Sequence, residues 1–278
     1  MIDQQLYPIQ DWDDAYANAS HIPNGLQYLD AWANDAAAFR LQQQALGKAD
    51  LDISYGPKER NKFDLFHPKD ESKGLVVFVH GGFWLMLDKS AWSHLAKGSL
   101  EAGYSVAMPS YTLCPQACIS EIVTEIGTAI EAAAALVSGE IRLTGHSAGG
   151  HLVTSMLCAD SPLSHKVLQR IVKTVSISGV HDLRPLLNTA MNEKLQLTSD
   201  QATALSPVLK SPAHLAPFTC WVGSDERPEF LRLNKLQAHI WQSFALPTDW
   251  VEESAKHHFN VVDGLMDQQH PLMQSLLA

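Results

Sequence analysis

From residue 74 onward, short apolar segments alternate with longer segments whose apolar residues follow a helical pattern. The short segments are rich in β-branched and aromatic residues, as strands usually are. Because two parallel strands need a crossover that is usually a helix, this alternation predicts a mostly parallel sheet with helices on both faces. The expected strands are 75–79, 105–111, 141–144, 172–178, 218–222 and 249–251, and the expected helices are 91–102, 119–136, 149–159, 228–245 and 259–277.

The remaining segments add to this sheet. Residues 51–55 and 62–66 alternate between apolar and polar side chains, which predicts two antiparallel strands ahead of the parallel ones. Residues 1–50 carry aromatic residues at helical spacing, and residues 181–215 form a long connection with a short helical stretch. We therefore expect one α/β domain over residues 1–278, with an N-terminal helical arm and a cap-like insertion. Each of these two additions is either a packing element or a wall of a site.

The charge of the chain argues against two classes of partner. Asp and Glu number 30 and Lys and Arg number 20, which gives a net charge of −10 at neutral pH. A surface this acidic repels phosphate backbones and anionic lipid headgroups. We expect a small-molecule substrate rather than nucleic acid or a membrane, and the sequence leaves a homodimer open.

Cofactor and targeting motifs are also missing from the sequence. It contains neither nucleotide-binding glycine loop, and its four cysteines have no neighbouring Cys or His pair, so we expect no cofactor and no metal. The first residues are polar and acidic, unlike a signal peptide, and no apolar run approaches the roughly 18 residues that span a bilayer. These features predict a cytoplasmic protein with reduced thiols.

Residues 145–149 read Gly-His-Ser-Ala-Gly, a G-x-S-x-G motif, directly after the predicted strand 141–144. The motif also opens the predicted helix 149–159, and this strand–turn–helix context is what a nucleophile elbow requires. In so sharp a turn only glycine fits at the two motif positions that flank the serine, two residues before it and two after it. The serine hydroxyl then stands clear at the carboxyl end of the strand. The motif predicts Ser147 as a nucleophile, and a serine in an ordinary loop is the alternative.

A second glycine-containing loop follows the first parallel strand, where residues 80–84 read His-Gly-Gly-Phe-Trp. Acyl transfer builds negative charge on the carbonyl oxygen, and backbone N–H groups aimed at that oxygen stabilise the charge. We expect the amides of Gly82 and Phe83 to form this oxyanion hole with the amide of Ala148, the residue after the nucleophile. A plain strand-to-loop turn is the alternative.

A serine hydroxyl becomes a good nucleophile when an imidazole removes its proton and a carboxylate orients that imidazole. In this type of sheet the chain order is serine, acid, histidine. His257 and His258 follow the last predicted strand, and we favour His258 as the base. Asp225 and Glu226 follow the preceding strand, where the acid belongs. Adjacent side chains cannot both point at the histidine, and spacing alone does not choose between them.

Together these motifs resemble those of the kynurenine formamidase (arylformamidase) branch of the α/β hydrolases, from about residue 55 to the end. Several of the matching phrases are not demanded by hydrolysis in general, which makes them more diagnostic than G-x-S-x-G. The matching segments are HGGFW at 80–84, GHSAGGHL at 145–152, SGVHDLRP at 178–185, PEF at 228–230 and HF at 258–259.

The resemblance implies a serine hydrolase that cleaves an aryl formamide, such as the N-formylkynurenine of tryptophan catabolism, through a formyl-serine intermediate. The family pattern G-x-x-D-x-P-E-F places Glu226 at the acid position, with Asp225 as the runner-up, and the same register places His258 as the base. A carboxylesterase acting on small acyl esters is the alternative function. A non-catalytic binding protein of this fold is a third hypothesis, against which the intact serine, acid and histidine argue.

Aromatic residues near the motifs are candidates for the walls of a substrate pocket. The substrate-binding residues that we expect are Trp84, Tyr111 and Phe259, although each could equally be part of the core.

Overall fold

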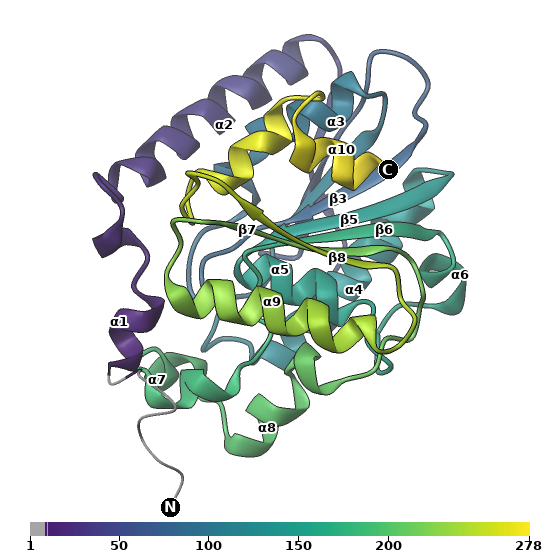
Figure 1. The fold of residues 1–278 in the computed structure, drawn as a ribbon. Helices are drawn as coiled ribbons and strands as arrows, with labels where there is room; N and C mark the ends of the chain where they lie inside the picture. Colours follow the sequence, from purple (N-terminus) through teal and green to yellow (C-terminus); the bar gives the residue numbers. More distant parts are fainter. Residues whose placement is uncertain (1–8, 10) are drawn as a thin grey trace, which may run out of the picture.

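The computed structural model describes residue 9 and residues 11–278, so part of the predicted N-terminal arm, residues 1–8 and 10, lies outside the described residues. Within the described chain, eight strands form one sheet in the order β1-β2-β4-β3-β5-β6-β7-β8 (Figure 1). The strands are β1 (Ala49–Ser54), β2 (Lys62–Phe66), β3 (Gly74–Val79), β4 (Ser105–Pro109), β5 (Glu140–His146), β6 (Ile171–Ile177), β7 (Phe218–Gly223) and β8 (Thr248–Glu253). β2 pairs antiparallel with both β1 and β4, and all other neighbours are parallel. The predicted mostly parallel sheet is confirmed.

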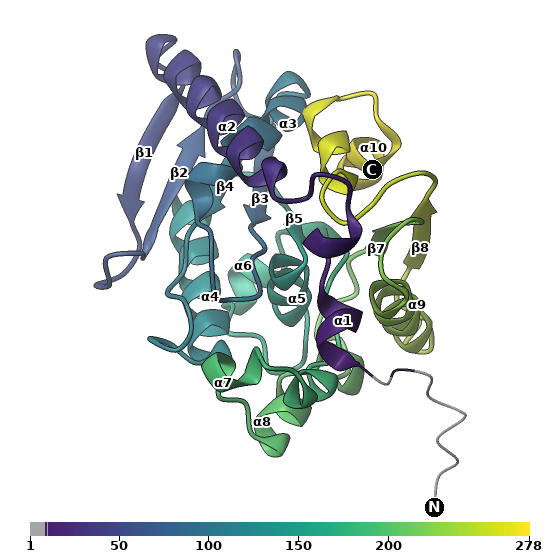
Figure 2. The same cartoon turned by 90° about the vertical axis from the view of Figure 1, so that its left-hand side faces the viewer.

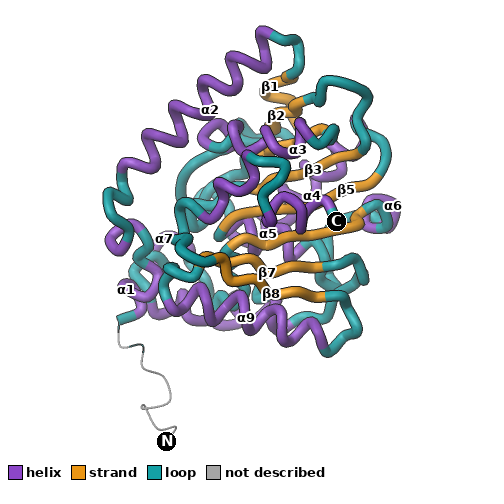
Figure 3. Tube along the Cα trace, turned by 45° about the horizontal axis from the view of Figure 1, so that its top comes forward, coloured by secondary structure: helices purple, strands orange, loops and turns teal. Residues whose placement is uncertain are grey.

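Helices cover both faces of this sheet, which forms a single layer between them (Figure 3). Helices α2, α3 and α10 lie on one side, and α4, α5 and α9 lie on the other (Figure 1). The α-helices are α1 (Trp12–Tyr16), α2 (Gln27–Ala45), α3 (Lys97–Glu101), α4 (Ile119–Leu136), α5 (Ala148–Ser155), α6 (His165–Leu168), α7 (Asn192–Leu195), α8 (Ser199–Ala204), α9 (Pro228–Gln242) and α10 (Pro271–Leu277). No helix in the described part of the chain is long and apolar enough to cross a membrane.

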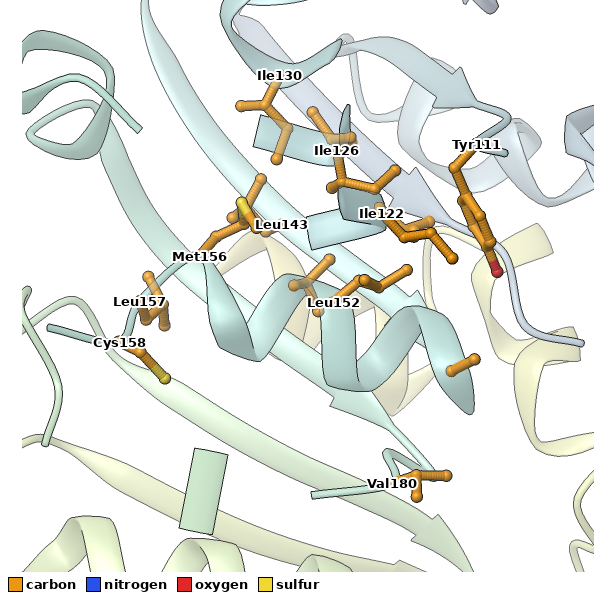
Figure 4. Packing of buried hydrophobic residues seen from close by; sticks show 14 of the residues in the cluster. Tyr111, Ile122, Ile126, Ile130, Leu143, Leu152, Met156, Leu157, Cys158 and Val180 are labelled. Atoms are coloured by element: carbon orange, nitrogen blue, oxygen red, sulfur yellow. The ribbon is translucent and has the colours of Figure 1, made fainter. Parts of the chain in front are cut away.

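The core is divided in two by the sheet, because successive side chains of a strand point to opposite faces. In β3, Leu75, Val77 and Val79 belong to the cluster that includes α4 and α5, whereas Val76 and Phe78 belong to the opposite cluster. Figure 4 shows the first cluster, in which isoleucines of α4 and apolar residues of α5 pack beside β5. With both faces buried, the central strand β3 is apolar throughout, as its sequence shows.

Two predicted helices are interrupted in the structure. The expected helix 259–277 is a 3₁₀-helix (Val261–Met266), an irregular segment and then α10. Pro271 begins α10 because proline has no N–H to continue a helix, and His270 before it is extended (φ −66°, ψ 141°). The expected helix 91–102 is a 3₁₀-helix (Ser93–Ala96) followed by α3, and Trp92 ahead of it has φ −126° and ψ 0°, outside helical geometry.

Residues 11–32, here called the N-terminal segment, contain α1, a 3₁₀-helix (Ala19–His21) and the start of α2. Figure 2 shows this segment running from α1, beside α9, across the molecule to α2. The connection 181–215 contains α7, α8 and two 3₁₀-helices (Arg184–Asn188 and Pro207–Leu209). Both parts contribute to the site described next.

Candidate active site

Ser147 lies in the tight turn between β5 and α5, with a left-handed backbone (φ 56°, ψ −116°) that a non-glycine residue rarely adopts. The two motif glycines make the turn sterically feasible. A Cβ at Gly145 would lie 2.3 Å from the carbonyl oxygen of Gly149, and a Cβ at Gly149 would lie 1.9 Å from the carbonyl oxygen of Val79. The strand–turn–helix geometry expected from the motif is therefore present.

His258 and Glu226 form a buried pair at the carboxyl ends of β7 and β8. Nδ1 of His258 lies 2.6 Å from Oε2 of Glu226, and the exposed fractions of the two side chains are 4% and 0%. Asp225, by contrast, is exposed, and its carboxylate accepts a hydrogen bond from the hydroxyl of neighbouring Ser224. Of the two carboxylates that spacing could not separate, Glu226 is the one that contacts the histidine.

The second oxygen of Glu226 is held by two groups that the motifs did not single out. Oε1 accepts hydrogen bonds from the hydroxyl of Ser178 and from the backbone N–H of Gly223, the latter at 2.9 Å. Ser178 is fully buried and has a left-handed backbone (φ 52°). The SGV segment that supplied part of the family resemblance thus orients the acid.

Ser147 and His258 line one cavity of about 410 Å³. Their side chains are not hydrogen-bonded to each other in this structure, and such contacts often shorten only when substrate binds. Most of the cavity wall is apolar or aromatic. The apolar lining residues are Ala17, Ala19, Leu26, Leu29, Trp32, Phe83, Met86, Leu87, Trp92, Met191 and Phe259.

The three amides expected to form an oxyanion hole belong to the loop after β3 and to the start of α5. Gly82 (φ 114°) and Phe83 (φ 52°) both have left-handed backbone, and both line the cavity. No hydrogen bond among the described residues uses the N–H of Gly82, Phe83 or Ala148, whereas the N–H of Ser147 donates to the carbonyl of Ile177 at 2.8 Å. Their role as an oxyanion hole stays a prediction.

Two of the expected substrate-binding residues are core residues, so that expectation was wrong for Trp84 and Tyr111. Both side chains have an exposed fraction of 0%, and neither lines the cavity. Trp84 packs edge-on against His151, and Tyr111 stacks on His80 and donates its hydroxyl proton to the carbonyl of His80. Consecutive left-handed residues at Phe83 and Trp84 leave Phe83 on the cavity side and Trp84 in the core. Phe259 does line the cavity.

The wall opposite the sheet comes from the N-terminal segment, which no motif pointed to. Tyr16, Asn18 and Trp32 line the cavity, and Trp32 packs against Phe259 with ring centroids 5.2 Å apart. Met191, from the connection 181–215, completes this side. The only sequence signal for this wall was the helical spacing of aromatic residues before residue 50.

Polar contacts attach the N-terminal segment to the rest of the molecule. The hydroxyl of Tyr16 donates to Glu229 of α9 at 3.1 Å, and the backbone N–H of Ala190 donates to Asp13 at 2.7 Å. Asp14 pairs with Arg227 and, at 2.6 Å, with His21. These contacts hold the segment against the connection 181–215 and against α9, which begins two residues after Glu226.

Several other histidines surround the site, and burial keeps them neutral. Burial lowers the pKa of His80 to about 4, and burial followed by the charge of His258 lowers the pKa of His146 well below its usual value. Nε2 of His146 donates to the backbone carbonyl of His258 at 2.9 Å, and the two rings lie 4.5 Å apart. In the described chain no group of three or more His, Cys, Asp or Glu side chains could hold a metal ion.

Comparison with protein families places this architecture. The family model described as BD-FAE matches residues 63–277, which is most of the chain. The chain belongs to the BD-FAE family. Its mostly parallel eight-stranded sheet with helices on both faces is the α/β-hydrolase fold, and this BD-FAE member is a serine-hydrolase-type enzyme.

Curated relatives of this BD-FAE member include kynurenine formamidases. The Danio rerio enzyme is 29% identical over 237 residues, covering 82% of this chain and 80% of that one. The Salmo salar enzyme is 28% identical and covers 84% of this chain and 83% of its own length. An isoprenylcysteine α-carbonyl methylesterase of Arabidopsis thaliana is 31% identical, but it covers only 51% of this chain and 37% of its own length. The resemblance to the kynurenine formamidase branch is thereby confirmed.

Solved structures give the same fold. A crystal structure from Silicibacter sp. TM1040, provisionally assigned as a thioesterase, has a TM-score of 0.92 and 47% identity, covering 96% of this chain and 99% of that one. The esterase of Pyrobaculum calidifontis has a TM-score of 0.69 at 16% identity, with 90% of each chain covered. At that identity the second likeness concerns the fold alone.

Proposed function

We propose that this enzyme hydrolyses aryl formamides of the N-formylkynurenine type, releasing an arylamine and formate through a formyl-serine intermediate. The observation that carries the proposal is the shared cavity, whose lining brings Ser147 and His258 together with the aromatic residues Trp32, Phe83 and Phe259. Behind the cavity, His258 is paired with the buried Glu226. Relatives named kynurenine formamidase, aligned over most of the chain, support the formamide as the reacting group.

In this mechanism Ser147 attacks the formyl carbon while Nε2 of His258 takes the hydroxyl proton. Nδ1 of His258 faces Glu226, which stabilises the imidazolium and keeps the proton of the neutral ring on Nδ1. The contacts of Ser178 and Gly223 with Glu226 leave its Oε2 oriented towards the histidine. The tetrahedral oxyanion is placed on the amides of Gly82, Phe83 and Ala148, which have no other acceptor among the described residues.

The aryl group matters for the second half of the reaction. His258 returns its proton to the departing nitrogen, and water then releases formate from the formyl-serine. Delocalisation of the nitrogen lone pair into the ring makes an arylamine a better leaving group than an alkylamine. An aromatic cavity next to an esterase-type site therefore suits an aryl formamide better than an aliphatic amide.

Ester or thioester hydrolysis is the second candidate. It uses the same residues, and relatives with methylesterase and provisional thioesterase names favour it. The cavity would then accept an apolar acyl or alcohol group instead of an arylamine.

Steady-state hydrolysis of N-formylkynurenine, p-nitrophenyl acetate and a short acyl thioester tests the proposal, with Ser147→Ala as the blank. We expect the highest kcat/KM for the formamide. Turnover of the ester or thioester with negligible formamide turnover would leave the site standing and overturn the formamidase assignment.

A further inference from the structure

Asn18 is a buried polar residue without a hydrogen-bonding partner for its side chain. Only 5% of the residue is exposed, it lines the cavity that holds Ser147, and both its Oδ1 and its Nδ2 lack a partner among the described residues. Burying a carboxamide without partners costs free energy, so such a group needs an explanation.

The usual structural explanation for an asparagine at this position does not apply. Asn18 is the N-cap of the 3₁₀-helix Ala19–His21, where asparagine commonly caps through its side chain. Here its backbone is helical (φ −67°, ψ −50°) and the side chain makes no capping bond. Its backbone N–H and carbonyl are already bonded to Tyr16 and His21.

The neighbouring polar side chains of the N-terminal segment are all satisfied. Tyr16 donates to Glu229, Ser20 donates to the carbonyl of Ala17, and Asp13 accepts from Ala190. The indole nitrogen of Trp92 and Nδ1 of His146 are also unpartnered at the cavity. Among the described side chains of the cavity wall, Asn18 differs from these two in offering both a donor and an acceptor.

The surroundings indicate what such a group could bind. The described wall is otherwise largely apolar. Apart from the histidines, Asp13 is the residue lining it that carries a formal charge at neutral pH. A carboxylate only accepts hydrogen bonds and would be repelled by Asp13, whereas a carbonyl or carboxamide pairs with Asn18 without bringing charge into the cavity.

We propose that Asn18 is a specificity-determining residue that hydrogen-bonds an uncharged carbonyl or carboxamide group on the leaving group of the substrate. This inference rests on the proposed function for the identity of the scissile bond. It implies that the charged amino-acid end of N-formylkynurenine remains in water at the cavity mouth, while the ring and its ketone enter.

Three aryl formamides that differ in one group test the inference. They are 4-formamidophenylacetamide, its hydrocarbon isostere 4-isobutylformanilide, and 4-formamidophenylacetate, in each of which a methylene separates the varied group from the ring. Asn18→Leu removes both hydrogen-bonding groups at similar volume. We expect it to lower the ratio of kcat/KM for the acetamide to that for the isobutyl compound by about tenfold, the value of one hydrogen bond.

A thermal unfolding scan separates this role from a structural one. Because the carboxamide has no partner, Asn18→Leu is expected to leave Tm unchanged or raise it. Asn34→Leu, an exposed asparagine of α2, is the matched control and should leave the substrate ratio unchanged. The acetate should be the poorest of the three substrates for the wild-type enzyme.

An unchanged substrate ratio in Asn18→Leu would overturn the inference. If kcat/KM fell equally for both substrates and Tm also fell, the role of Asn18 would be structural. Phenyl acetates that carry the same three groups serve as ester substrates, and they distinguish a failure of this inference from a failure of the proposed function. Ester turnover without formamide turnover overturns the proposed function, while the ester ratio still decides the role of Asn18. If neither series is hydrolysed, both proposals fail.

Discussion

The two sides of the cavity are built in different ways. On the sheet side, Ser147, Glu226 and His258 follow the ends of strands β5, β7 and β8, and backbone geometry and short hydrogen bonds hold them in place. On the opposite side, the N-terminal segment is attached by a few side-chain contacts, two of them with Asp14 at the surface. We infer that the first side sets the chemistry and the second side sets what enters.

The largest expected effect concerns the nucleophile on the sheet side. Ser147→Ala should lower kcat by at least about 10⁴-fold, because without the hydroxyl no formyl-enzyme can form. Tm should not fall, because alanine tolerates the turn no worse than serine. Retained turnover of the formamide would contradict the assignment of Ser147.

The second-largest effect is expected for the acid, Glu226. Glu226→Gln should lower kcat by about 10² to 10⁴-fold, because an amide at this position no longer stabilises the imidazolium. Asp225→Asn, the adjacent and exposed carboxylate, is the matched control and should leave kcat nearly unchanged. Equal losses in the two variants would show that charge near the site, rather than the contact with His258, matters.

The ion pairs of Asp14 with Arg227 and His21, here called the clasp, attach the N-terminal segment. As the pH falls, the free energy of unfolding of the α/β domain should fall before these ion pairs are lost. Burial lowers the pKa of both His80 and His151 to about 4. Between pH 6.5 and 4, these two histidines are therefore protonated in the unfolded chain and neutral in the folded chain. The free energy of unfolding therefore falls as the pH falls, by about 3 kcal/mol for each such histidine. Urea titrations at pH 7, 5.5 and 4.5 measure this decline.

The clasp is also weakened as the pH falls, but at a lower pH than the buried histidines. The hydrogen bond from His21 and the charges of Arg227 and His21 lower the pKa of Asp14 below 3.8. Its contribution is complete above that value and is lost only as the pH falls through the lowered pKa. A flat unfolding free energy between pH 6.5 and 4 would contradict the neutral state of the buried histidines.

The smallest expected effect is that of the clasp on substrate binding. Asp14→Asn should raise KM about two- to fivefold and leave kcat nearly unchanged. Exposed ion pairs contribute little free energy, and these pairs position the cavity wall rather than the reacting residues. The difference should shrink in high salt. Asp30→Asn, an exposed residue of α2, is the control, and a loss in kcat for Asp14→Asn would place the segment closer to the chemistry than we infer.

The sequence predicted the sheet side well because its residues carry local signals. Gly145 and Gly149 are needed for steric reasons beside Ser147, and the apolar strands alternate with helices at regular spacing. The choice of Glu226 over Asp225 came from the family register, and the structure agrees with it through the contact with His258.

The residues that were mispredicted or missed depend on long-range packing. Trp84 and Phe83 are neighbours in one motif, and only the three-dimensional turn decides that one lies in the core and the other at the cavity. A lone Asn18 has no local pattern that would connect it with Ser147. Pro271 could have been recognised as the break in the last helix.

The bond between Tyr16 and Glu229 joins residues that are 213 positions apart in the chain. During synthesis the aromatic residues of the N-terminal segment therefore leave the ribosome long before α9 and the loop of His258 exist. Until the last quarter of the chain emerges, Tyr16 lacks Glu229 and Trp32 lacks Phe259. The substrate cavity is thus among the last features that a nascent chain can complete.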